Sequence, residues 1–338
     1  MADTVDQSAG FPYGKSAIFI QYNGDVIIFS KHMYDIIIIG GGPGGVAAGV
    51  YAARKQMKSL LVTENFLSQS TVSASIENWI GTVTIPGYEF AQTLEKHLRA
   101  QEGIEIRTED RVAKIEEIAG GFAVTTTKGE RYETKAAIIA TGGRHRHLDV
   151  PGEEKFVGKG VVFCSTCDAP FFRGKRTVVV GSGNSALEAV EDLLPYASEI
   201  TLLVRSGELK GDQVTRDRIM GDSRVKVIYF GTTQEILGEE KLTGLRYLDT
   251  QSNEEKVIET DGVFVEIGML PNTEFVKGLV DLNERGEIVL DHRTKATSKP
   301  GIFAAGDATD APYKQNNISA GDGVVAALAA YEYVKKSS

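Results

Sequence analysis

Two copies of one short pattern constrain the fold of this chain more than any other feature: a buried strand that runs through a glycine-rich turn into a helix. In the first copy the apolar residues 34–39 lead into the turn at residues 40–45, and a helical stretch begins at Val46. The glycines permit the tight turn, and the free N–H groups at the helix start bind a pyrophosphate. The residues expected to hold a dinucleotide are Gly40, Gly42, Pro43 and Gly45, with Glu64 after the next strand as the acceptor for ribose hydroxyls. This copy predicts a bound adenine dinucleotide, with a merely tight strand-to-helix turn as the alternative.

The second copy repeats the same order further along the chain. An apolar strand at residues 176–180 leads into a turn at residues 181–186 and a helix at residues 187–194. The residues expected at this second nucleotide site are Gly181, Gly183, Asn184, Ser185 and Ala186. Alanine in place of the third glycine still allows the helix to pack closely on the strand. Two copies in a chain of 338 residues predict two nucleotide-binding domains.

The nucleotide preference of the second copy is left open by its sequence. An NAD site wants a carboxylate near Val204, and an NADP site wants clustered arginines for the 2′-phosphate. Neither pattern is present. Arg205 and Lys210 either hold a phosphate together or are solvated loop charges.

The chain contains two cysteines, Cys164 and Cys167, spaced Cys-x-x-Cys. Such a pair can open and close a disulfide, because the tight loop lowers the pKa of one thiol and makes it a better nucleophile. Asp168 follows directly and can move a proton to or from a departing thiolate. The alternatives are a zinc half-site and two inert buried thiols. No second Cys-x-x-Cys exists, and His145 and His147 lack metal-ligand spacing to the cysteines, so no metal is expected.

Two further strand ends are expected near the cofactor. A buried strand at residues 136–140 ends at Thr141 and Gly142, a small-residue turn that allows close approach of the backbone. The last apolar strand ends at Gly306 and Asp307, where a carboxylate can accept hydrogen bonds from a polyol chain.

Residues 1–33 precede the first fingerprint. Residues 16–22 and 25–29 read as two strands around an Asn-Gly turn, which predicts a β-hairpin that covers a surface or a subunit interface.

Charge and hydropathy exclude several classes of partner. The net charge is −9, with interspersed acids and bases and no long basic run, so neither nucleic acid nor an anionic membrane is expected as a partner. The N-terminus lacks the pattern of a signal peptide, and no apolar run has membrane length, which predicts a soluble cytoplasmic protein. Thiols are kept reduced there, so an isolated Cys-x-x-Cys is expected to be catalytic.

From about Tyr34 to Tyr333 the chain resembles the low-molecular-weight thioredoxin reductase family and its relative, the flavoprotein reductase of alkyl hydroperoxide reductase. The motifs that carry the likeness are Gly40-x-Gly42-x-x-Gly45, Glu77-Asn78-Trp79, Ala140-Thr141-Gly142, Cys164-x-x-Cys167-Asp168, Gly181-x-Gly183-x-x-Ala186 and Ala305-Gly306-Asp307. The stretch Pro312-Tyr313-Lys314-Gln315 is closer to the peroxiredoxin-reductase branch.

The resemblance implies an α/β fold with two Rossmann-like three-layer domains, the second inserted into the first. The implied parts are residues 1–33 as an extension, residues 34–152 and 281–338 as the FAD-binding domain, and residues 153–280 as a pyridine-nucleotide-type domain that carries the disulfide. It also implies a homodimer and a rotation of the inserted domain during turnover.

The resemblance implies roles for individual residues as well. Cys167 is the sulfur nearer the flavin, Cys164 attacks the protein substrate, and Asp168 is the acid/base. The further residues implied at the FAD site are Gln69, Asn78, Thr141, Gly142, Gly306, Asp307, Lys314 and Gln315. Electrons are expected to pass from a donor through FAD to the cysteine pair, and then to a dithiol protein such as thioredoxin.

The sequence departs from the family at two places. Leu67-Ser68-Gln69 stands where the family has Gly-Gly-Gln, and Val204-Arg205-Ser206 with Lys210 replaces the His-Arg-Arg-x-x-x-Arg pattern of NADPH sites. Each lost charge-assisted contact weakens phosphate binding by about 1.5–3 kcal/mol. The electron donor therefore stays open between NADPH, NADH and ferredoxin. The alternative to a reductase is a flavin-bearing redox sensor or interaction protein without nicotinamide-driven turnover.

Overall fold

The structure of the chain is a computed structural model that describes residues 17–22, 25–30, 33–73 and 75–337. The chain forms two compact units. The first unit takes the described residues of Met1–Thr71, Tyr88–Gly143 and Pro271–Ser338, and the second takes those of Val72–Gly87 and Arg144–Leu270. The main part of the second unit, Arg144–Leu270, overlaps the residues 153–280 expected for the inserted domain, but it begins before residue 153 and ends before residue 280.

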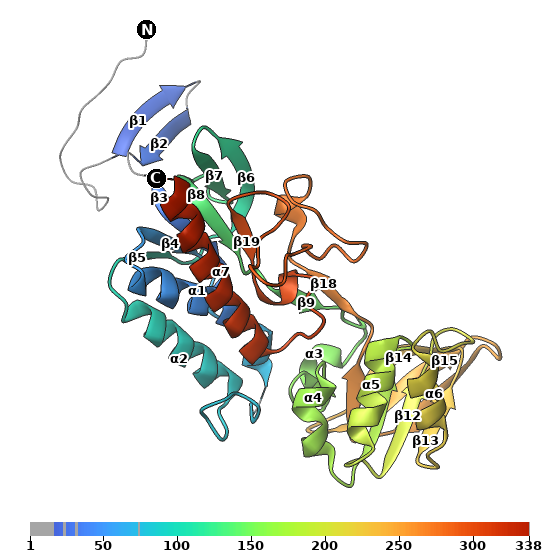
Figure 1. The fold of residues 1–338 in the computed structure, drawn as a ribbon. Coiled ribbons are helices and arrows are strands. Elements are labelled where there is room, and N and C mark those ends of the chain that lie inside the picture. The colour runs from blue at the N-terminus through green and yellow to red at the C-terminus, as the bar shows by residue number, and fades with distance from the viewer. Residues whose placement is uncertain (1–16, 23–24, 31–32, 74, 338) are drawn as a thin grey trace. The chain divides into compact units, whose positions relative to one another are not determined.

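The first unit is built on a nine-stranded sheet with the path β1-β2-β8-β3-β4-β5, to which β19, β6 and β7 are added (Figure 1). Its strands are β1 (Ala17–Tyr22), β2 (Asp25–Ser30), β3 (Tyr34–Ile39), β4 (Ser59–Val62), β5 (Ile104–Arg107), β6 (Val112–Ile118), β7 (Gly121–Thr126), β8 (Arg131–Ile139) and β19 (Ile302–Ala304). Its helices are α1 (Pro43–Arg54), α2 (Gly87–Arg99) and α7 (Asn316–Ser337), with short 3-10 helices η1 (Gln69–Val72), η3 (Glu274–Val276) and η4 (Gly306–Ala308).

Alternation along β3 explains the three layers of this unit. Ile36 and Ile38 are fully buried in a core shared with α1 and α7, whereas Ile37 and Ile39 are buried in a second core on the other face. A strand buried on both faces reads as a continuous apolar run, as residues 36–39 do. Strands β19, β8, β3, β4 and β5 pair in parallel.

The N-terminal ribbon contains both predicted strands. β1 pairs antiparallel with β2 from Ala17 opposite Ser30 to Tyr22 opposite Asp25. β2 continues the sheet at Phe29, which pairs with Arg131 of β8. The predicted Asn-Gly turn, residues 23–24, lies outside the described residues.

The second unit has a parallel sheet of its own in the order β10-β17-β11-β12-β13 and a separate antiparallel sheet β14-β15-β16. Its strands are β10 (Val161–Val162), β11 (Arg176–Val180), β12 (Glu199–Leu203), β13 (Val225–Ile228), β14 (Gly231–Gly238), β15 (Leu242–Asp249), β16 (Glu254–Glu259) and β17 (Gly262–Val265). Its helices are α3 (Glu153–Phe156), α4 (Ser165–Asp168), α5 (Asn184–Leu193) and α6 (Gln213–Met220), with the 3-10 helix η2 (Ala169–Phe172).

The strands β9 (Gly143–His145) and β18 (Met269–Pro271) form a two-stranded sheet. The nine-stranded sheet and the sheet β10-β17-β11-β12-β13 each contain parallel strands and each carry a strand, glycine turn and helix in sequence, so the predicted α/β class with two Rossmann-like folds is confirmed. In the part of the chain that the structure describes, no helix is both long enough and apolar enough to cross a membrane.

Candidate active site

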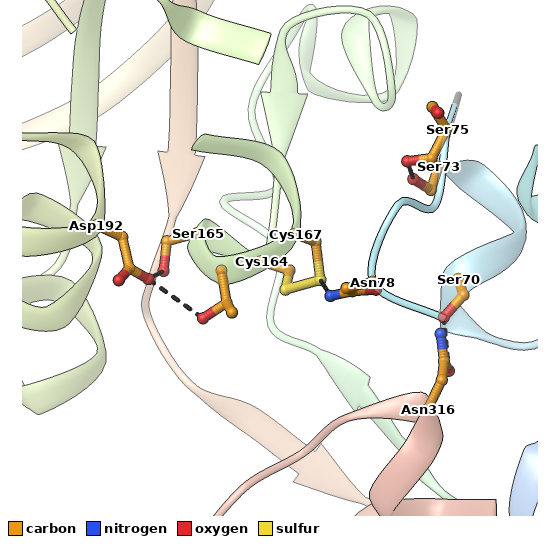
Figure 2. The surroundings of a disulfide bond; sticks show 10 residues. Ser70, Ser73, Ser75, Asn78, Cys164, Ser165, Cys167, Asp192 and Asn316 are labelled. Carbon is orange, nitrogen blue, oxygen red and sulfur yellow. Dashed lines mark hydrogen bonds between the residues drawn. A yellow bond between two sulfur atoms is a disulfide. The ribbon is translucent and has the colours of Figure 1, made fainter. Parts of the chain in front are cut away.

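The two cysteines are joined as a disulfide in the second unit, with their Cα atoms 5.3 Å apart (Figure 2). Cys164 is the residue before α4, and its carbonyl oxygen accepts hydrogen bonds from the N–H groups of Cys167 at 3.2 Å and Asp168 at 3.0 Å. The predicted tight loop is therefore a single helical turn closed by the sulfurs. The Asn78 side-chain amide donates to Sγ of Cys167 at 3.9 Å. The motif residue Asn78 is thus brought to one of the two sulfurs.

Carboxylates surround this turn. Oδ2 of Asp192 on α5 accepts hydrogen bonds from the hydroxyls of Ser165 at 2.8 Å and Thr166 at 3.2 Å. Burial raises the pKa of Asp168 to about 6. Burial, with the charge of Asp192 as the next cause, raises the pKa of Glu266 to about 8. The predicted acid Asp168 is therefore poised to hold or release a proton near neutral pH, and Asp192 and Glu266 are neighbours that the sequence analysis missed.

We expect the Asp168→Asn substitution to stabilise the protein at high pH. The folded-state pKa of Asp168 lies above its ordinary value of 3.8, so the folded state binds this proton more tightly than the unfolded state does. Stability is then lost as pH rises through the window from about 4 to about 6, and the neutral amide avoids that loss. The free energy of unfolding in urea should rise by about 2 kcal/mol at pH 8 and stay unchanged near pH 4. Asp217→Asn, which alters an exposed carboxylate on α6, is the control and should show no such pH dependence.

Two histidines flank the residue before the first cysteine. The His145 ring stacks on Phe163 with centroids 5.1 Å apart, and the His147 ring meets the same phenyl ring edge-on at 5.1 Å. Nδ1 of His147 lies 3.3 Å from Oε1 of Glu153, a carboxylate with 3 % side-chain exposure. Burial, with His147 nearby, lowers the pKa of His145 to about 4, so this ring is neutral at pH 7. These rings hold Phe163 in place ahead of Cys164.

The second fingerprint occupies the turn between β11 and α5. Gly181 has a φ of +157°, and a Cβ there would lie 2.4 Å from the carbonyl oxygen of Glu266. α5 begins after Gly183 with no side-chain cap and no acidic residue in its first turn, so its first N–H groups are available to an anion. The Asn184 side chain accepts a hydrogen bond from the backbone N–H of Asp212 at 2.7 Å, whereas Ser185 is exposed. This turn has the form of a phosphate-binding loop.

The two cations expected at this site lie on one loop. Val204 is fully buried after β12, and Arg205 is exposed. The backbone N–H of Lys210 donates to the carbonyl oxygen of Ser182 at 2.7 Å, which ties the loop to the fingerprint, and the Lys210 side chain is exposed. Both cations are therefore on the solvent side of the predicted nucleotide site.

The first fingerprint fits a dinucleotide. A Cβ on Gly40, whose φ is +112°, would lie 2.3 Å from the carbonyl oxygen of Ala140, and one on Gly45 would lie 1.9 Å from that of Gly40. By contrast, the nearest atom to a Cβ on Gly42 is Cβ of Ser68 at 3.9 Å. α1 begins after Gly42 with no side-chain cap and no acid in its first turn. Gly40 and Gly45 thus allow the close packing of the turn. The space beside Gly42, over the start of α1, stays open, and we call this space the cradle.

Polar residues of the first unit meet at Asp307. Its Oδ2 accepts from the Gln69 side-chain amide at 3.2 Å, and its Oδ1 accepts from the Ser319 hydroxyl at 3.3 Å. Burial raises the pKa of Asp307, while the Lys314 charge opposes that shift. The structure therefore brings together the predicted residues Gln69, which begins η1, and Asp307, which lies in η4 after β19.

The other residues predicted at this site have different surroundings. The Thr141 hydroxyl donates to the carbonyl oxygen of Asn272 at 2.7 Å, and Gly142, with a φ of +63°, has open space where a Cβ would be. The Lys314 ammonium lies 3.0 Å from Oε1 of Glu287 and also donates to the carbonyl oxygen of Thr309. Gly306, the first residue of η4, has a φ of +72°. Lys314 is thus held by protein atoms.

Glu64 follows β4 and is exposed, with Oε2 3.8 Å from Nε of Arg111. The Gln315 carbonyl oxygen accepts a hydrogen bond from the Ser319 N–H at 2.9 Å.

The comparisons with known proteins agree with this geometry. The chain matches the family described as pyridine nucleotide-disulphide oxidoreductase over residues 34–326. A solved thioredoxin reductase from Streptococcus pyogenes MGAS5005 is 33% identical with a TM-score of 0.83, covering 90% of this chain and 99% of that chain. A thioredoxin reductase from Giardia duodenalis is 30% identical with a TM-score of 0.84 over the same shares of 90% and 99%.

Curated relatives are similar over nearly the whole chain. An alkyl hydroperoxide reductase subunit of Staphylococcus aureus (strain Mu50) is 43% identical over 305 residues, which are 90% of this chain and 60% of that protein. The protein of the same name in Pseudomonas putida is 40% identical over 313 residues, 92% of this chain and 60% of that protein. The chain therefore spans 60% of the length of these relatives.

Proposed function

We propose a function from one premise: this chain belongs to the pyridine nucleotide-disulphide oxidoreductase family, an FAD-dependent family of enzymes. It is a thioredoxin reductase-like disulfide oxidoreductase with a redox disulfide, Cys164–Cys167. The specific function that we propose is the reduction of a disulfide in a thioredoxin-like protein with electrons from a nicotinamide nucleotide. One observation carries this proposal: the disulfide turn follows β10 and the second fingerprint follows β11, and both strands belong to the same parallel sheet of the second unit.

The first unit is the proposed FAD site. The open cradle at Gly42 and the uncapped start of α1 suit a pyrophosphate, and Glu64 at the end of β4 suits a ribose. Asp307, held by Gln69 and Ser319, suits a polyol hydroxyl. When bound, FAD supplies the chemistry that accepts two electrons from a nicotinamide and passes them to a disulfide.

The cysteine pair performs the exchange with the partner in this proposal. The Cys164 thiolate attacks a sulfur of the partner disulfide, which forms a mixed disulfide and releases one partner thiolate. Cys167 then attacks Sγ of Cys164, which restores the Cys164–Cys167 bond and releases the second partner thiolate. Asp168, with its pKa raised to about 6 by burial, gives up a proton to a departing thiolate.

The proposed donor is a nicotinamide nucleotide bound at the second fingerprint. The uncapped start of α5 suits its pyrophosphate, and Arg205 and Lys210 are the cations next to the end of β12. Because Val204 is the residue where an NAD site would carry an acid, the charges of this loop favour NADPH over NADH.

Anaerobic titration of the flavin tests the donor. NADPH should bleach the flavin absorbance, and Arg205→Ala or Lys210→Ala should raise the KM for NADPH by roughly tenfold, since each removes a charge-assisted contact of about 1.5 kcal/mol or more. The KM for NADH should not change in either variant. Lys226→Ala, which removes an exposed cation from β13, is the matched control. Bleaching by reduced ferredoxin alone would contradict this donor, and no bleaching by any of the three would favour the sensor hypothesis.

A second partner is favoured by the curated relatives, whose names identify them as subunits of alkyl hydroperoxide reductases. The reduced chain is then expected to pass its electrons to a peroxide-reducing dithiol protein. Turnover with a purified thioredoxin and with a purified two-cysteine peroxiredoxin, each offered alone, separates the two partners. The homodimer and the cytoplasmic location stay predictions from the sequence.

A further inference from the structure

Glu266 lies at the edge of the second sheet between two functional segments. The carboxyl ends of parallel strands share one edge, and β17 pairs with β10 on one side and with β11 on the other. β10 leads to Cys164, β11 leads to Gly181, and Glu266 is the first residue after β17. Glu266 therefore stands between the disulfide turn and the second fingerprint, in the crevice where α/β sheets bind ligands.

The contacts of Glu266 connect it to the first sulfur. The backbone N–H of Ser165 faces the Glu266 carboxylate and lowers its pKa. The Ser165 hydroxyl donates to Asp192 at 2.8 Å (Figure 2). Ser165 directly follows Cys164 and is buried. Two acids from different elements thus face the residue next to Cys164: Asp192 accepts from the hydroxyl of Ser165, and Glu266 lies at its backbone N–H.

The charges that act most strongly on Glu266 are those of three acids. Asp192 and Glu188 approach from α5, and Asp168 approaches from α4. Burial together with these charges raises the pKa of Glu266 to about 8, and the hydrogen bond from Ser165 opposes this shift. Glu266 is therefore neutral at pH 7 and acquires its charge above about pH 8.

We propose that Glu266 is a positioning residue that controls the reactivity of Cys164 in the reduced protein, acting at Ser165. Reduction of the disulfide takes up two electrons and two protons and yields two thiols. Loss of the Cys164 proton to solvent then gives the thiolate, which is the attacking form. A neutral Glu266 leaves that thiolate stable, whereas an ionised Glu266 places a like charge at the adjacent residue, Ser165, and raises the pKa of the thiol. The inference depends on the cysteine pair alone, and not on the donor or partner proposed above.

The experiment measures the rate of Cys164 alkylation by iodoacetamide across a pH series in the full-length chain carrying Cys167→Ser, which leaves one of the two cysteines. In this background, Glu266→Gln and Glu266→Ala each remove the titrating carboxyl. Two different neutral side chains are used so that the test still stands if one of the variants fails to fold. We expect both to lower the pH midpoint of alkylation and to raise the rate near that midpoint by roughly threefold or more, which is half a pKa unit. Glu266→Asp keeps a carboxyl and should retain the parent profile.

The matched control is Glu240→Gln, which removes an exposed carboxylate between β14 and β15 and should leave the profile unchanged. Flavin absorbance and the unfolding midpoint verify the fold of each variant. Profiles of the neutral Glu266 variants that superpose on the parent would overturn the inference, and so would an equal shift in Glu240→Gln, because that shift would report net charge. Loss of turnover with thioredoxin or NADPH would leave this result unaffected.

Discussion

Cys164→Ser is expected to lose turnover of a thioredoxin-like disulfide by roughly a thousandfold or more, because it removes the proposed attacking nucleophile. The flavin should stay bound, since Gly42, Glu64 and Asp307, which are proposed to bind it, belong to the first unit and the substitution is in the second. Steady-state reduction of the partner and the visible absorbance of the purified protein measure the two effects.

Cys167→Ser is the informative companion, because it should lose turnover equally but keep the attacking thiol. Mixed with an oxidised partner, Cys167→Ser should accumulate a covalent complex that dithiothreitol releases, since the second cysteine needed to resolve it is missing. Cys164→Ser should form no such complex under the same conditions. Trapping by Cys164→Ser and not by Cys167→Ser would reverse the assigned roles, and normal turnover by either variant would refute the disulfide mechanism.

Two glycines of the first fingerprint, Gly45 and Gly42, should differ in how substitution by alanine changes stability and flavin binding. Gly45→Ala places a Cβ 1.9 Å from the backbone oxygen of Gly40, so the turn must shift, and we expect the free energy of unfolding to fall by about 3 kcal/mol or more. Gly42→Ala meets no atom closer than 3.9 Å and has an ordinary φ of −74°, so the fold should be kept. Its methyl group would instead occupy the cradle proposed for the pyrophosphate.

Flavin content separates these two outcomes. Gly42→Ala should bind FAD at least about tenfold more weakly while its unfolding midpoint without added FAD stays close to that of the parent. Gly45→Ala should be less stable even without flavin. A Gly42→Ala protein that retains FAD with unchanged affinity would move the pyrophosphate away from this turn.

The local parts of the fold could be predicted from the sequence because their signals are contiguous. The strand, turn and helix at residues 34–54 and 176–193 were both read from glycine spacing and apolar runs, and the structure forms them as β3 with α1 and β11 with α5. The Cys-x-x-Cys turn was equally visible. Helix α6 was missed, although Asp212 caps it by accepting from the Thr215 N–H at 2.9 Å, a signal that was present in the sequence.

The carboxylates around the disulfide could not be predicted in the same way. Glu266 lies near Ser165 because β10 lies beside β17, a pairing between strands about a hundred residues apart that no local pattern encodes. Asp192 reaches Ser165 because α5 packs against α4. The same limit applies to Lys314, which was predicted at the FAD site and whose ammonium is held by Glu287. Residue type and spacing indicate which chemistry a site contains, but the neighbours that tune it depend on tertiary pairing.

The surroundings of Cys167 have a consequence for work with fragments. Asn78 belongs to the short stretch Val72–Gly87 of the second unit, whereas the sulfur that it contacts belongs to Arg144–Leu270. A recombinant piece cut at residues 144 and 270 would keep the parallel sheet and the sulfur pair but leave this amide behind. Thiol chemistry measured on such an excised piece would describe an incomplete environment, and a graft that rejoins residues 72–87 is needed to restore it.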